Sequence, residues 1–249
     1  MQYRRLGRTE LMVAEVGAGT GSLPSEGEVA AETLRAAIDA GCTLIEFAID
    51  DAGATAAIIE VVQRQRLHVL LVATGNGDIT QLEAALEQLG NPSIELYLVD
   101  AGNVAALSAL RESEFTRFAG VAATDAAEAL AAIEGGEADI MQWPYHLGGP
   151  DAEAVFAAAA TADVGLIGCS PLAGGQLLRG AAAGAVTSLI AGAPRTPAQA
   201  AIAWALSEPR LAAVVVASRT AAQATENAEG SDVAPLPEPE LERVAGLLG

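Results

Sequence analysis

The spacing of short apolar runs constrains the fold of this chain more than any other feature. Eight such runs, mostly 22 to 28 residues apart, alternate with segments of helical pattern. Strands that alternate with helices form parallel sheets, and eight such units are typical of a closed (β/α)8 barrel. The runs lie at residues 16–20, 43–47, 69–73, 94–99, 118–121, 140–143, 164–168 and 213–216.

The remaining segments complete the predicted architecture. Residues 3–16 indicate a short hairpin that precedes the barrel. Nothing resembling a linker divides the chain, so we expect one α/β domain over residues 1–249, with a C-terminal helix at its end. A doubly wound open sheet is the alternative. The expected helices lie at residues 28–40, 55–64, 79–89, 104–112, 125–133, 151–161, 197–207, 220–227 and 238–248.

Charge and composition limit the kinds of partner that we expect this chain to bind. The formal net charge is −19, which repels phosphate backbones and anionic lipid, so neither nucleic acid nor a membrane surface is an expected partner. No apolar run approaches the length of a membrane span. Cys42 and Cys169 fall on different strands, which indicates free thiols and a cytoplasmic location. The chain contains no lysine, so all 13 basic residues are arginine.

The loop after the seventh apolar run has the composition of a ligand-binding loop. Ser170 and Pro171 open it, and Gly174 and Gly175 follow. Proline bends the chain, and glycine lets backbone amides approach a ligand closely. We therefore expect a small-molecule ligand at this end of the barrel.

Several motifs, in this order, resemble those of the aldo-keto reductases. The resemblance spans nearly the whole chain, and it implies a (β/α)8 barrel that binds NADPH at the carboxyl ends of its strands. The matching stretches are YRRLGRT at residues 3–9, GAGT at 17–20, RAAIDAG at 35–41, QWPY at 142–145, SPLA at 170–173, PAQ at 197–199 and SR at 218–219.

The resemblance does not extend to the catalytic tetrad of Asp, Tyr, Lys and His. The Asp position falls on Glu46, and the Tyr position falls near Asp51. The Lys position is Gly75, and the His position is Asp100. Because the chain has no lysine, no shift of the alignment restores one.

The resemblance to the coenzyme site is mixed. It implies that Ser170, Leu172 and Gly175 contact the diphosphate, and that Gln142 supports the nicotinamide amide. It also implies that Arg219, Gln223 and Asn227 bind the adenosine phosphate, where a guanidinium suits a 2′-phosphate. However, the aromatic residue on which the nicotinamide stacks falls on Cys169, and the Ser-Asn pair after the fifth strand is Ala122-Ala123. We therefore expect NADPH to be held through its phosphate end only.

These observations leave three hypotheses for function. The first is redox-neutral acid–base chemistry (isomerisation, dehydration or cyclisation) by Glu46, Asp51, Asp100 and His146 at the barrel mouth. Glu46, Asp100 and His146 would face one pocket from the ends of the second, fourth and sixth strands, either as acids and bases or around a hard cation. The second hypothesis is a non-catalytic binding protein, and the third is a weak NADPH-dependent oxidoreductase. Acidic residues occupy three of the positions that the resemblance assigns to the tetrad, and this favours the first hypothesis.

Overall fold

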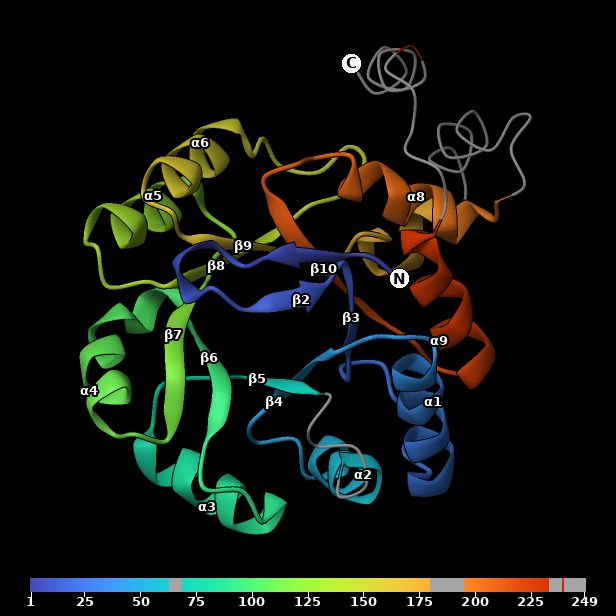
Figure 1. Cartoon of the computed structure of the whole chain (residues 1–249), viewed down its shortest axis with the longest axis horizontal. Helices are drawn as coiled ribbons and strands as arrows, with labels where there is room; N and C mark the ends of the chain where they lie inside the picture. Colours follow the sequence, from blue (N-terminus) through green and yellow to red (C-terminus); the bar gives the residue numbers. More distant parts are fainter. Residues whose placement is uncertain (63–68, 180–194, 233–238, 240–249) are drawn as a thin grey trace.

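The eight expected strands form a closed parallel barrel in the computed structural model, which describes residues 1–62, 69–179, 195–232 and 239. The strands follow the order β10-β3-β4-β5-β6-β7-β8-β9, so the chain winds once around the barrel (Figure 1). This confirms the (β/α)8 barrel over an open sheet. The barrel strands are β3 (Val16–Gly19), β4 (Leu44–Ala48), β5 (Leu70–Gly75), β6 (Ile94–Asp100), β7 (Thr116–Ala122), β8 (Ile140–Pro144), β9 (Gly165–Cys169) and β10 (Leu211–Ala217).

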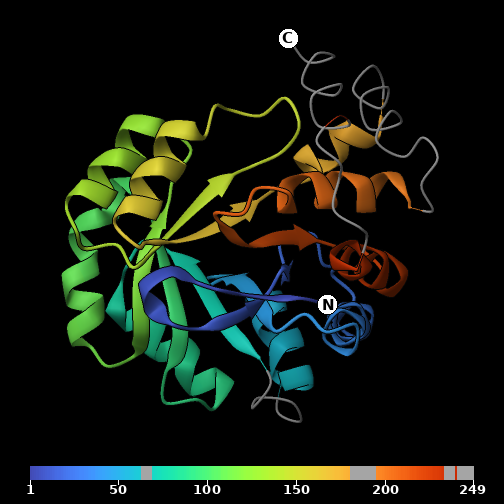
Figure 2. The same ribbon diagram turned by 45° about the horizontal axis from the view of Figure 1, so that its top comes forward.

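Helices surround the barrel on its outside (Figures 1 and 2). Their starts follow the capping residues of the sequence. Asp78 accepts hydrogen bonds from two amides of the first turn of α3, and Thr196 forms a capping box with Gln199 at α8. The α-helices are α1 (Gly27–Asp39), α2 (Ala52–Val62), α3 (Ile79–Leu89), α4 (Leu107–Glu112), α5 (Ala126–Glu134), α6 (Glu153–Thr161), α8 (Pro197–Leu206) and α9 (Ala221–Ala228), and the 3-10 turns are η1 (Gly7–Thr9), η3 (Ala101–Ala106), η4 (Ala173–Leu178) and η5 (Glu229–Ser231).

Side chains of each strand alternate between two buried layers. On β6, Leu96 and Leu98 belong to the cluster that fills the barrel, whereas Tyr97 and Val99 pack in the layer between strands and helices. This is the period-two pattern of a strand covered on both faces. The same alternation fixes which strand-end residues point into the barrel mouth.

The expected N-terminal hairpin is present and lies across one end of the barrel (Figure 2). It pairs β1 (Tyr3–Arg5) with β2 (Met12–Ala14). Leu6 and Val13 join the cluster inside the barrel. Gly7 has a φ of +48°, and a Cβ there would lie 2.3 Å from the backbone nitrogen of Gly165. A glycine is therefore required where the hairpin meets β9.

Two of the helices expected from the sequence are not described as expected. All but one residue of the C-terminal helix expected at 238–248 lies outside the described residues. The helix expected at 104–112 is divided, because η3 precedes a shorter α4. No described helix is long and apolar enough to cross a bilayer.

Candidate functional site

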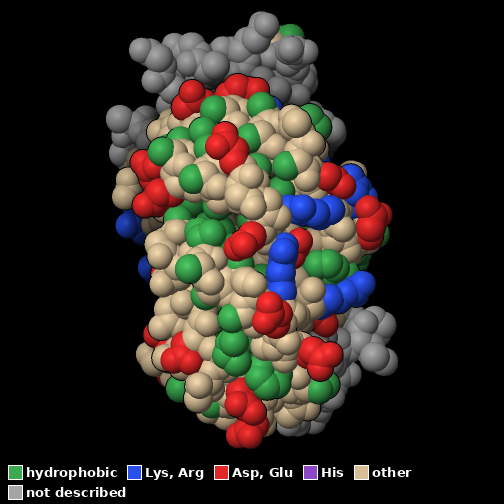
Figure 3. Space-filling view, turned by 90° about the vertical axis from the view of Figure 1, so that its left-hand side faces the viewer, with side chains coloured by type: hydrophobic (Ala, Val, Ile, Leu, Met, Phe, Trp, Pro, Cys, Tyr) green, Lys and Arg blue, Asp and Glu red, His purple; other side chains and the backbone are tan. Residues whose placement is uncertain are grey.

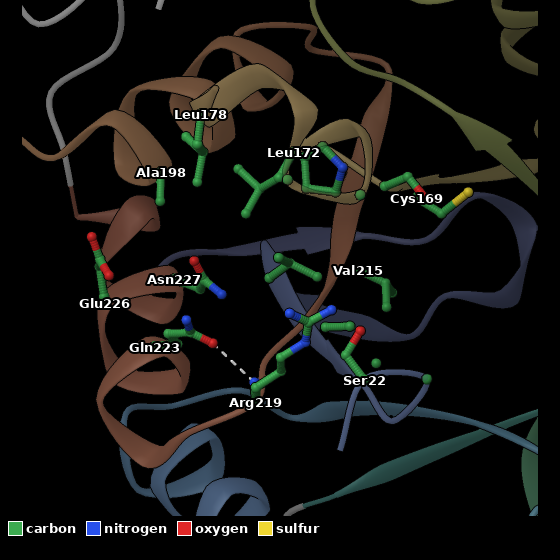
Figure 4. A pocket seen from close by; sticks show the side chains of 18 of the residues that line it. Ser22, Cys169, Leu172, Leu178, Ala198, Val215, Arg219, Gln223, Glu226 and Asn227 are labelled. Carbon is green, nitrogen blue, oxygen red and sulfur yellow. Dashed lines mark hydrogen bonds between the residues drawn. The ribbon is translucent and has the colours of Figure 1, made fainter. Parts of the chain in front are cut away.

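A cavity of about 490 Å³ opens at the carboxyl ends of the barrel strands. Its floor lies over the barrel, and its far end lies against the start of α9 (Figure 4). Residues at or near the carboxyl ends of four strands, and in the segments after them, line it. They include Gly19, Gly21, Ser22, Glu46, Cys169, Ser170, Leu172, Gly174, Gly175, Arg179, Ala217, Arg219, Gln223, Glu226 and Asn227.

The segment at residues 170–175, which follows β9 and includes the start of η4, forms one wall of this cavity. Its backbone is left-handed at Ser170, Ala173, Gly174 and Gly175, with φ values of 55°, 48°, 63° and 85°. Two short turns stabilise it, because the amides of Ala173 and Gly175 donate 2.8 Å hydrogen bonds to carbonyl oxygens within the loop. Backbone that changes between right- and left-handed conformations turns successive N–H groups to one side, where they can bind an anion.

Arg219 lies between β10 and α9. Its backbone N–H donates a 3.0 Å hydrogen bond to Oε1 of Gln223, one turn into the helix. This bond holds the start of α9 while the guanidinium points into the cavity (Figure 4). Among the described residues no carboxylate forms an ion pair with that guanidinium. The helix terminus and the arginine together favour a phosphate.

Neighbouring side chains on α9 are also held in place. Asn227 is buried, and its amide donates a 3.0 Å hydrogen bond to the hydroxyl of Ser218. Glu226 also lines the cavity and adds a negative charge to it. Arg179, which follows η4, brings a second positive charge. The lining is therefore balanced in charge, unlike the chain as a whole, whose acidic side chains are spread over the face seen in Figure 3.

The floor of the cavity is built from residues that point into the barrel. Glu46 follows Leu44 on the inward face of β4, and Gln142 follows Ile140 on the inward face of β8. The side-chain amide of Gln142 donates a hydrogen bond to the Glu46 carboxyl. Burial raises the pKa of Glu46, and this hydrogen bond opposes the shift.

Cys169 lies beside this pair at the end of β9. Burial raises the pKa of its thiol to about 12, and the nearby charge of Glu46 adds to the shift. Such a thiol is protonated at neutral pH and is a poor nucleophile. The cavity floor therefore presents a carboxyl, to which the Gln142 amide is hydrogen-bonded, and a neutral thiol.

The structure does not bring the four expected catalytic side chains together. Of these four residues, only Glu46 lines the cavity. Asp51 accepts a 2.9 Å hydrogen bond from the amide of Ala54 and so caps α2. Asp100 is exposed at the end of β6, and His146 lies with Nδ1 3.1 Å from the carbonyl oxygen of Leu147 in its own turn. The suggested cation site is likewise not formed, since no metal-binding group of His, Cys, Asp or Glu occurs in the described part of the chain.

The residues expected to contact coenzyme are closer to one another than the expected catalytic residues are. Six of the seven line the cavity, namely Ser170, Leu172, Gly175, Arg219, Gln223 and Asn227, and Gln142 is linked to it through Glu46. Sequence reasoning missed Arg179, Ser22 and Glu226. Arg179 had a usable signal, because it is a rare positive charge shortly after the Gly174-Gly175 turn in an acidic chain.

A parallel barrel with a phosphate-suited cavity at its carboxyl ends defines a class of coenzyme-binding barrel proteins. Comparison with known proteins makes the assignment specific. The model of the aldo/keto reductase family matches residues 81–248, so the chain belongs to this family. No curated protein matches the chain.

Solved structures agree on the fold. An aldo-keto reductase from Bacillus halodurans in its holo form is 17% identical with a TM-score of 0.87, and the match covers 99% of this chain and 96% of that one. A thermostable aldo-keto reductase in complex with the inhibitor epalrestat is 23% identical with a TM-score of 0.83, over 99% and 100% of the two chains. The protein from Brucella melitensis is 20% identical with a TM-score of 0.80, over 98% of each chain.

The expectation of redox-neutral chemistry is wrong. Membership of the aldo/keto reductase family indicates an NAD(P)H-dependent oxidoreductase, and nothing in the structure or the comparisons supports isomerisation, dehydration or cyclisation. The geometry gives the physical reason. Glu46 lines the cavity, but Asp51 and His146 take part in separate turns and Asp100 faces solvent, so the four residues do not meet at one substrate.

Proposed function

We propose that this protein is an NADP(H)-dependent oxidoreductase that reduces a small carbonyl compound. The dinucleotide extends along the cavity, from the start of α9 to the floor above the barrel. One observation carries this proposal: the Arg219 guanidinium points into the cavity without a carboxylate partner among the described residues. An arginine in a protein of net charge −19 is ordinarily surrounded by acids, so an unpaired one in a cavity is suited to an anionic ligand.

The donors of the cavity fit the two charged parts of such a coenzyme. Arg219 and the amides at the start of α9 suit the 2′-phosphate, and the left-handed loop of Ser170 and Gly175 suits the diphosphate. Gln223 and Asn227 hold the helix in the orientation that this requires. The coenzyme supplies a hydride when it is bound, and the carbonyl substrate accepts it.

The phosphate end supplies most of the affinity. Cys169 stands where the resemblance places an aromatic residue, so the nicotinamide lacks a stacking partner there. The floor instead offers Glu46, which accepts a hydrogen bond from the Gln142 amide. Both cysteines are free, which fits a protein of the reducing cytoplasm.

Titration calorimetry with NADPH, NADH and 2′,5′-ADP tests the proposal. We expect NADPH and 2′,5′-ADP to bind with affinities within about tenfold of each other, and NADH to bind at least about tenfold more weakly, because a charged hydrogen bond contributes about 1.5–3 kcal/mol. Oxidation of NADPH is then measured with nitrobenzaldehyde, methylglyoxal and phenanthrenequinone. Absence of NADPH binding would overturn the proposal. If NADPH binds but none of the three compounds oxidises it, the protein is a nucleotide-binding protein and not the proposed oxidoreductase.

A further inference from the structure

The Glu46 carboxyl occupies a distinctive place on the cavity floor. It lies on β4, and its partner Gln142 lies on β8, which is the opposite strand of the closed barrel. The hydrogen bond between them therefore spans the mouth above the apolar side chains that fill the barrel. Glu46 is the residue of this pair that lines the cavity.

Among the described residues, Glu46 is the one carboxyl at this end of the cavity. On β3 the adjacent lining residue is Gly19, and on β9 it is Cys169, whose pKa of about 12 keeps it neutral. The other titratable residues of the described lining, Arg179, Arg219 and Glu226, belong to the walls and to the far end. No cation neutralises Glu46 among its described hydrogen-bond partners.

A carbonyl that is reduced in this cavity needs a proton. Hydride addition to the carbon leaves negative charge on the oxygen, and a nearby acid lowers the barrier by protonating it. The chain has no lysine, and its tyrosines at positions 3, 97 and 145 do not line the cavity. A carboxyl can act as this acid if enough of it is protonated at working pH, and burial without a cation raises the pKa of Glu46 in that direction.

We propose that Glu46, oriented by Gln142, is the proton donor for carbonyl reduction in this protein. This inference rests on the proposed function. The carboxyl O–H bond breaks, and a new O–H bond forms on the substrate oxygen as its carbon accepts a hydride from the reduced nicotinamide coenzyme. The carbonyl is reduced to an alcohol, the coenzyme is oxidised, and water returns a proton to the Glu46 carboxylate.

The test combines a titration of the free protein with kinetics of the loaded one. In protein labelled with ¹³C at the glutamate carboxyl, the resonance missing from Glu46→Gln reports the ionisation of Glu46. We expect its midpoint above the ordinary glutamate range, and higher again in Gln142→Leu, because the amide bond favours the carboxylate. A midpoint in the ordinary range would contradict the proposal without reference to coenzyme.

In the loaded protein we expect kcat for NADPH oxidation with the best of the three carbonyl probes to fall as pH rises through the same midpoint. Glu46→Gln should lower kcat by about 10²–10⁴-fold, with the Kd for NADPH unchanged within about threefold. That unchanged Kd also shows that the variant is folded. If the wild type neither binds nor oxidises NADPH, both proposals fail. If the wild type is active and Glu46→Gln keeps its kcat and its pH profile, only the role of Glu46 is overturned.

Discussion

The hydroxyl of Tyr97 occupies the space beside Gly75, so that a Cβ added at Gly75 would lie 2.5 Å from the phenolic oxygen. Tyr97 is fully buried on the outer face of β6, and its hydroxyl accepts a 3.3 Å hydrogen bond from the amide of Gly77. The position that the resemblance assigns to a lysine is thus closed by a tyrosine from the next strand. The packing of Tyr97 therefore leaves no room for a side chain at Gly75.

Replacement of Gly75 by Ala should therefore destabilise the protein. The added methyl group forces Tyr97 to move, and overpacking of this kind costs about 1–3 kcal/mol in the free energy of unfolding. Urea denaturation measures it. The double variant Gly75→Ala with Tyr97→Phe should recover part of the loss, because the clashing oxygen is removed. Equal stability of Gly75→Ala and the wild type would show that Tyr97 is not fixed in this position.

Arg219 should determine the selectivity for a 2′-phosphate. Arg219→Ala should weaken binding of 2′,5′-ADP by about 10–150-fold, which corresponds to the loss of a charged hydrogen bond of about 1.5–3 kcal/mol. NADH affinity should change little. Calorimetry compares these ligands, with Arg117→Ala as the matched control, because Arg117 lies over the ring of Phe118 away from the cavity. An equal loss for NADH would place Arg219 outside the 2′-phosphate site.

Both cysteines should be unreactive in the folded protein at pH 8. Burial raises the pKa of Cys42 and of Cys169 to about 12. Each thiol should react with Ellman's reagent roughly a thousandfold more slowly than in urea, because the thiolate is the reactive form. Because the pKa of each thiol is raised in the folded state, the neutral thiols contribute stability that is fully present below the ordinary thiol pKa. That contribution is lost as pH rises toward 12. Rapid reaction of one thiol, assigned with Cys42→Ala, would contradict the burial at that site.

Glu15 should stabilise the closure of the barrel by the N-terminal hairpin. Its buried carboxylate accepts hydrogen bonds from Arg4 at 2.5 Å and from Ser231 at 3.0 Å. Glu15→Ala removes the carboxylate that pairs with Arg4, whose guanidinium keeps its hydrogen bonds to backbone carbonyl oxygens, so we expect a loss of about 1.5–3 kcal/mol in unfolding free energy. The matched control is Glu60→Ala, which removes an exposed pair with Arg35 and should cost less than about 1 kcal/mol. Similar losses for both variants would show that burial does not strengthen the hairpin contact.

The sequence by itself determined the barrel, because the signal for it is local and repeated. Each apolar run predicts a strand from its own residues, and eight such runs separated by helices leave few topologies open. The loop that contains Ser170 and Gly175 was also readable, since proline and glycine specify backbone conformation directly. Residues of this loop and Arg219, which precedes α9, line the same cavity.

Only the tertiary structure decided which polar side chains share a site. Glu46 and Gln142 are 96 residues apart, and they meet because the barrel closes with β4 opposite β8 and both residues on the inward face. Asp51 and His146 lie beyond strand ends, where local turns rather than strand alternation set the direction of a side chain. Strand periodicity can therefore be read from sequence, whereas the direction of a residue in a loop depends on hydrogen bonds that form only in the folded chain.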